Sequence, residues 1–326
     1  MSAQAGIDAA PPRPLWQVIV IRPETMTLAL LALAIVVGAQ LSPYFLDVRY
    51  ILDSFTLSAE LALLALVMTM VIIAGEIDLS GASAMALSAC VFAYALSFGW
   101  PYPVAVLVCV ASGLLMGAIN ALLIIRLGLP SIIVTIGTLT LYRGLAQVIA
   151  GDKSIRLPEW YIGVDKLTLF GLPLPDLIFI LAAAALSVML GMTIWGRQIY
   201  QVGTNPVAAR HAGIRSNVIK TALFLAMGLT ASIAGMIFVS RLGSVRYDLG
   251  LGGELQMVLM AMLGGTYIFG GRGTILGTFF AAWLLSAIST GMITAEWPPA
   301  TQLCVLGVLL IVSIVATNFI YSRTQR

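Results

Sequence analysis

The feature that most constrains this chain is its series of long apolar segments. Ten segments are each close to the length of about 20 mostly apolar residues that a membrane-crossing helix needs. They span residues 26–42, 57–74, 81–98, 102–125, 130–150, 176–195, 216–239, 251–270, 274–292 and 300–318. Within a bilayer a helix satisfies its own backbone hydrogen bonds. The sequence therefore predicts an all-α, polytopic membrane protein with about ten transmembrane helices.

The composition supports a lipid environment. Of the 326 residues, 60% are hydrophobic and only 10% are charged, whereas soluble domains carry about 25% charged residues. The mean hydropathy is +1.03. The formal net charge of +3 is too small and too dispersed for nucleic-acid binding, so no nucleic-acid partner is expected.

The chain divides into three parts. Residues 1–25 are broken by prolines and carry two arginines, which predicts a cytoplasmic lead without a cleavable signal and with an interfacial patch at Leu15–Ile21. Residues 26–320 form one transmembrane domain, and residues 321–326 form a cytoplasmic tail. The segments 81–98 and 251–270 are rich in Gly and Ser and have polar entries, so each is a candidate for a broken or re-entrant helix.

The distribution of Lys and Arg residues predicts the orientation of the chain in the membrane. Ten spans place both termini on one side of the membrane. With the N-terminus inside, ten Lys or Arg residues fall on the inner side, six fall on the outer side, and Arg143 stays within a span. The excess predicts that both termini are cytoplasmic. Arg143 is expected to extend toward the outer interface, with pairing to Glu60 as an alternative.

Two pairs of motifs suggest an internal repeat. IDLSGA at 77–82 resembles YDLGLG at 247–252, an offset of 170 residues. LLMGAINALLI at 114–124 resembles WLLSAISTGMI at 283–293, an offset of 169. The offsets indicate two copies of a four-helix unit, spans 2–5 and 7–10. Because corresponding spans are five apart in the chain, the two copies cross the membrane in opposite directions. Inverted repeats of this kind place a substrate route between the halves.

A polar stretch, GRQIYQVGTNPVAARHAGI at 196–214, interrupts the apolar pattern on the cytoplasmic side. Asn205 is a helix cap and Pro206 suits the first turn. Gly213 marks the end of the helix. The stretch predicts a short docking helix at 205–213 outside the bilayer, whose small side chains Ala208 and Ala209 let another protein approach. Arg210 is expected to bond acidic or carbonyl groups around that contact.

Polar residues within the spans are candidates for a solute pathway. Carboxylates at membrane depth are costly and often mark such routes. Asp78 and Ser80 have two open roles, capping of the third span and direct contact with solute, and Asp248 is expected to play the matching part on the outer side. Interhelical hydrogen bonding is the commoner use of the hydroxyl and amide residues. The candidates are Glu76, Asp78, Ser80, Asn120, Thr135, Thr138 and Asp248.

These motifs resemble a known family. The polar stretch, the LGGTYIFGGRGTILGT sequence at 263–278, AGEIDLSGAS at 74–83 and VTIGTLTLYRG at 134–144 are similar to inner-membrane permeases of ABC importers for ribose and related sugars. The resemblance covers residues 50–315, and the rhamnose and autoinducer-2 members look most similar. Glu76 is a departure, because the family usually has Gly there, so the local pathway geometry does not transfer directly.

The resemblance implies the partners. In this family two permeases pair, as copies or as paralogues, in the bacterial inner membrane. A cytoplasmic ABC ATPase docks on the helix that corresponds to 205–213, and a periplasmic sugar-binding protein delivers solute. The chain holds no G-x-x-x-x-G-K-[ST] phosphate loop, so we expect no cofactor here and ATP on a partner subunit.

Two other functions compete with the ABC permease. An ion-coupled secondary transporter needs intramembrane carboxylates, for which only Glu76 and Asp78 are candidates, and it leaves the docking helix unexplained. An intramembrane enzyme is disfavoured by the single His and the three scattered Cys. The sequence therefore predicts a non-enzymatic permease that carries a small sugar-like solute inward.

Overall fold

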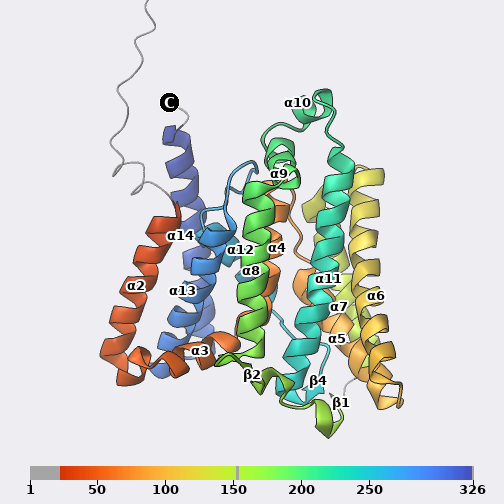
Figure 1. Ribbon diagram of the computed structural model, residues 1–326, viewed down its shortest axis with the longest axis vertical. Coiled ribbons are helices and arrows are strands. Elements are labelled where there is room, and N and C mark those ends of the chain that lie inside the picture. The colour runs from red at the N-terminus through yellow and green to blue at the C-terminus, as the bar shows by residue number, and fades with distance from the viewer. Residues whose placement is uncertain (1–22, 152–153, 325–326) are drawn as a thin grey trace, which may run out of the picture.

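The computed structural model describes residues 23–151 and 154–324 and is a bundle of helices (Figure 1). The helices are α2 (Pro23–Leu41), α3 (Val48–Thr56), α4 (Ala59–Ile73), α5 (Gly81–Ser97), α6 (Tyr102–Ala121), α7 (Ser131–Ala150), α8 (Leu174–Met192), α9 (Ile194–Thr204), α10 (Pro206–His211), α11 (Ser216–Leu242), α12 (Gly253–Leu263), α13 (Ile275–Thr294) and α14 (Pro299–Thr324). A π-helical turn, Leu122–Arg126, extends α6.

Short strands and turns occupy the connections. Antiparallel pairs join β1 (Ile155–Arg156) to β4 (Ser244–Val245), and β2 (Thr168–Leu169) to β3 (Leu172–Pro173). Three 3₁₀ turns span Pro43–Leu46, Glu159–Tyr161 and Val164–Lys166. The β1–β4 pair ties the loop after α7 to the loop after α11, and thereby joins the two repeats at one end of the bundle.

The polytopic all-α class is confirmed. In the described residues, seven helices are long and apolar enough to cross a membrane, and an eighth span forms if α3 and α4, bent by 69°, count together. Of the two segments expected to be broken or re-entrant, 81–98 is one continuous helix and 251–270 is broken. The helix predicted at 81–98 is α5, with 17 residues, and the segment 251–270 holds only the 11-residue α12. After Leu263 the chain leaves the helix at Gly264 and at Gly265, which takes a positive φ, and Gly270 and Gly271 in the following loop also take positive φ.

Helix α4 forms the centre of the bundle. Fourteen of its fifteen residues are buried, and it packs against α8, α11, α12 and α13. A helix that is apolar on all sides requires this position, because no face of it suits water. Glu60, in its first turn, is its only charged residue.

The packing has the reciprocal form that an inverted repeat requires. α11 packs on α5 and α6, while α4 packs on α12 and α13. Within the units, α5 contacts α6 and α7, and α12 contacts α13 and α14. The short helices α5 and α12 hold the same place in each unit, as the motif offsets predict.

The bundle has two distinct ends. The start of α2, the end of α14 and α10 lie together at one end, which we call the α10 end (Figure 1). The pair β1–β4 and helix α3 lie at the other, the β-strand end. Most of the predicted lead, with the patch Leu15–Ile21, and the last two residues of the tail lie outside the described residues.

Candidate functional site

Helix α10 is capped at both ends. Asn205 Oδ1 accepts hydrogen bonds from the backbone N–H of Val207 at 3.1 Å and of Ala208 at 3.0 Å. Pro206 occupies the first turn, where a missing N–H costs nothing. Gly213 follows the helix with φ of +81°, a conformation that strains any residue with a Cβ. The predicted cap, first turn and stop are confirmed.

The exposed face of α10 differs from the expected one. The helix projects beyond the ends of the long helices, between α9 and α11 (Figure 1). Ala208 and Arg210 are exposed, but Ala209 is only 4% exposed and packs inward. The expectation that Ala209 lies on the outward face is therefore wrong. Val207, which was not singled out from the sequence, is 65% exposed and adds an apolar contact.

Four polar residues from three segments form a buried cluster, the Asp78 network. Asp78, 1% exposed, accepts hydrogen bonds from Ser80 N–H at 2.9 Å and from Ser80 Oγ at 2.6 Å. Asn120 of α6 donates from Nδ2 to Ser80 Oγ at 2.8 Å. Tyr142 of α7 donates from its hydroxyl to Asn120 Oδ1 at 3.3 Å and to Met116 O at 2.9 Å. The network joins the segment before α5 to α6 and α7.

The capping role expected for Asp78 and Ser80 is wrong in its details. Ser80 occupies the N-cap position of α5 but its side chain makes no capping hydrogen bond. Its hydroxyl lies between Asp78 and Asn120 instead, and the Asp78 carboxylate bonds to the residue before the helix. The two side chains therefore join helices rather than cap one.

The α7 candidates also bond within the bundle. Thr135 Oγ1 donates to Ser131 O at 2.8 Å and approaches Ile77 O at 3.3 Å. Thr138, 4% exposed, donates to Thr135 O at 3.4 Å. Tyr142 was not singled out from the sequence, although its spacing from Thr135 and Thr138 puts all three on one helix face. Most of these bonds lie within α7, and only the one from Thr135 to Ile77 O reaches another segment, the turn between α4 and α5.

The remaining carboxylates lie apart from the Asp78 network. Glu76 forms an ion pair with Lys220 near the start of α11, with side chains 13% and 20% exposed. Asp248 pairs with Arg246 at 3.2 Å, and its side chain is 40% exposed. Asp78 is buried and Asp248 is not, so the two residues differ in their surroundings, and the role of Asp248 in the solute pathway stays a prediction.

Arg143 neither extends outward nor pairs with Glu60. It forms a 3.0 Å ion pair with Glu254 of α12 and donates to the carbonyls of Tyr247 at 2.9 Å and Leu249 at 2.5 Å. Its side chain is 13% exposed. The arginine thus fixes the loop before α12, and joins α7 of the first repeat to α12 of the second.

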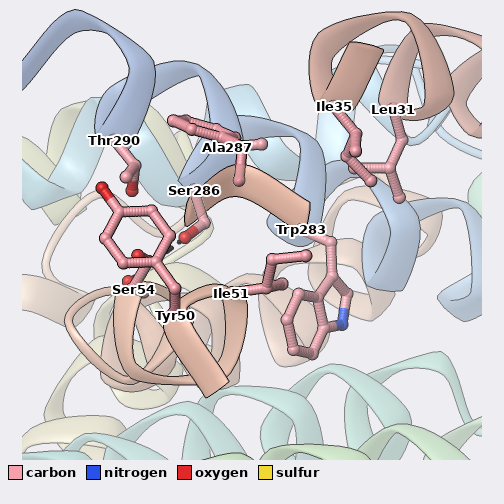
Figure 2. A pocket seen from close by; sticks show the side chains of 10 residues that line it. Leu31, Ile35, Tyr50, Ile51, Ser54, Trp283, Ser286, Ala287 and Thr290 are labelled. Atoms are coloured by element: carbon pink, nitrogen blue, oxygen red, sulfur yellow. Dashed lines mark hydrogen bonds between the residues drawn. The ribbon is translucent and has the colours of Figure 1, made fainter. Parts of the chain in front are cut away.

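A pocket lies away from these residues, between α2, α3 and α13 (Figure 2). Figure 2 shows Leu31 and Ile35 on one side, and Tyr50 and Thr290 on the other. The wall is mostly apolar, with hydroxyls from Ser54 and Ser286. Its place beside the peripheral helix α2 differs from that of the Asp78 network at the contact of α5, α6 and α7.

Comparison with known proteins gives one family. The family described as "Branched-chain amino acid transport system / permease component" matches residues 50–314. The autoinducer 2 import system permease protein LsrD of Klebsiella pneumoniae is 33% identical over 307 residues, 92% of each chain. LsrD of Escherichia coli K12 is 32% identical over 309 residues, 93% of this chain and 94% of the relative. No solved structure matches.

These findings agree with the capped helix at one end of a polytopic bundle, and they describe a transport role rather than an enzymatic one. The chain therefore belongs to the family of branched-chain amino acid transport system permease components, and it is the membrane-spanning permease subunit of an ABC importer.

Proposed function

We propose that the chain carries a small sugar-like solute of the autoinducer-2 and ribose type into the cell, driven by a separate ATPase. The LsrD relatives, whose name states autoinducer 2 import, support this solute class. The proposal includes no cofactor on this chain. It places the chain in the bacterial inner membrane with both termini in the cytoplasm.

The observation that carries the proposal is α10. A six-residue helix with a bonded cap, a glycine stop and an exposed face of Val207, Ala208 and Arg210 has no packing role on its outward side. Small side chains allow close approach, and the arginine offers planar hydrogen bonding at the rim. We propose that the ATPase docks on this face.

The other partners follow from the same arrangement. The start of α2 and the end of α14 lie at the α10 end (Figure 1), which supports cytoplasmic termini if the ATPase docks there. A periplasmic sugar-binding protein then meets the β-strand end, where Trp160 is 61% exposed. A second permease, as a copy or a paralogue, completes the importer within the lipid bilayer.

The test is reconstitution of this chain with its ATPase, its binding protein and, where the second permease is a paralogue, that paralogue in liposomes, with autoinducer 2 and D-ribose as probe solutes. We expect uptake that requires ATP and every component of the complex. Uptake by this chain alone, driven by a proton or sodium gradient, would contradict the proposal and favour an ion-coupled transporter.

A further inference from the structure

The two helices that flank α10 contact the same short segment of the protein. α9 precedes α10 and α11 follows it. Both reach the end of α4 and the turn after it, residues Ile73–Glu76, which we call the α4 turn. The contacts differ in kind, since one is made by backbone atoms and the other by an ion pair.

The contact from α9 is a backbone contact through Gly203. A Cβ placed on Gly203 would lie 1.7 Å from the carbonyl oxygen of Ile73 and 2.7 Å from the N–H nitrogen of Gly271. That same nitrogen donates to Ile73 O at 2.8 Å. No residue other than glycine fits without separating α9 from the α4 turn.

The glycine loop between α12 and α13 completes this junction. A Cβ on Gly270 would lie 3.0 Å from Gly75 Cα, and one on Gly271 would lie 2.5 Å from Thr204 Oγ1. Tyr200 of α9 donates its hydroxyl to Gly273 O at 2.7 Å. The last turn of α9, the α4 turn and the loop of the second repeat are therefore in close contact, mostly through backbone atoms.

The contact from α11 is the ion pair between Lys220 and Glu76. Both side chains are partly exposed, so either charge can be solvated when the pair separates. Two residues after Glu76 the chain enters the Asp78 network, which holds α5 against α6 and α7. The α4 turn thus lies between the flanks of α10 and the buried polar cluster.

We propose that the α4 turn receives the displacement of α10 during the transport cycle. Gly203 transmits it as a fixed backbone contact, and the Glu76–Lys220 pair is the contact that separates and re-forms between two states. The inference rests on the proposed docking of an ATPase on α10. Its physical basis is a closely packed junction beside an ion pair whose two side chains are partly exposed, so that water can solvate them when they part.

The test uses the full reconstituted complex and measures uptake of autoinducer 2 or D-ribose per ATP hydrolysed. In Glu76→Gln and in Gly203→Ala we expect this ratio to fall about fivefold or more, the lower end of usual coupling between sites. The charge-swapped variant Glu76→Lys with Lys220→Glu is expected to recover most of the ratio. Gly191→Ala is the matched control, because nothing lies within 4 Å of a Cβ at that position of α8.

The outcomes separate this inference from the proposed function. A wild-type complex without ATP-driven uptake overturns both. A wild-type complex that couples normally, together with variants whose ratio equals that of wild type, overturns only the role of the α4 turn. If a variant loses thermal stability but keeps the wild-type ratio of uptake to ATP hydrolysed, the contact has a structural role only. That result also overturns the role proposed for the α4 turn. If the Gly203→Ala variant does not fold, the ratio of uptake to ATP hydrolysed in Glu76→Gln alone tests the role of the α4 turn.

Discussion

Glu60 at the start of α4 and Arg241 near the end of α11 form an ion pair of 3.0 Å, although 181 residues separate them in the chain. Glu60 is 1% exposed in its side chain and Arg241 is 14% exposed. Arg241 also donates to Thr56 O at 2.6 Å. The pair joins α4 and α11, the first helices of the two repeats, at the β-strand end of the bundle.

We predict that Arg241→Met destabilises the protein by about 3–5 kcal/mol, because it leaves the Glu60 carboxylate buried without a partner. Unfolding by SDS in mixed micelles measures the change. The control is Arg246→Met, whose pair with Asp248 is exposed and is expected to contribute less than about 1 kcal/mol. Equal losses in the two variants would refute the prediction.

The docking face of α10 gives a second prediction. Ala208→Glu places a long charged side chain on the exposed face, and Gly213→Trp forces a large residue into a φ of +81°. Both variants should reach the membrane but lose coupled uptake, because the ATPase no longer fits. Uptake and ATPase stimulation in liposomes measure this, and wild-type values for both would contradict it.

The cap of α10 gives a third, milder prediction. Asn205→Ala removes the acceptor for two backbone N–H groups and should cost the helix about 1 kcal/mol. We expect weaker copurification of the ATPase, with Asn205→Asp retaining most of it. The control, Asn217→Ala on the exposed start of α11, should leave copurification unchanged.

The Asp78 network gives a fourth prediction. Asn120→Leu removes a donor to Ser80 and an acceptor for Tyr142. Ser80 keeps its bond to Asp78 and Tyr142 its bond to Met116 O, so the cost is that of two lost hydrogen bonds, about 1 kcal/mol each. We expect stability and uptake to fall together, whereas Thr140→Ala, at an exposed position of α7, should change neither. Loss of uptake with unchanged unfolding would instead assign Asn120 to the solute pathway.

Close packing of α6 on α11 gives a fifth prediction. A Cβ on Gly117 would lie 2.3 Å from Phe224 O, and one on Gly113 would lie 1.9 Å from Ser232 Oγ. Gly117→Ala should therefore cost about 1–3 kcal/mol through overpacking. Gly137→Ala, with nothing within 4 Å, should leave the SDS unfolding midpoint unchanged.

The sequence predicted those features that depend on neighbouring residues. The cap of α10 by Asn205 and its end at Gly213 need only adjacent positions, and both were confirmed. The break in the segment 251–270 was expected from its Gly content, whereas the break expected in 81–98 is absent, since α5 is one continuous helix.

Features that depend on distant residues were missed. The partners of Glu60, Glu76 and Arg143 lie 181, 144 and 111 residues away, and no periodicity encodes such pairings. The close contact at Gly203 depends on the path of α4. Ala209 turned inward because a six-residue helix must bury one side on the helices that flank it.

The two ion pairs between α4 and α11 lie at opposite ends of both helices. Sliding one helix lengthwise along the other would break both pairs at once. A tilt about Glu60 and Arg241 breaks only the pair of Glu76 with Lys220. Geometry therefore favours a wedge-shaped opening, narrow at the β-strand end and wide at the α10 end, over a uniform gap along the bundle.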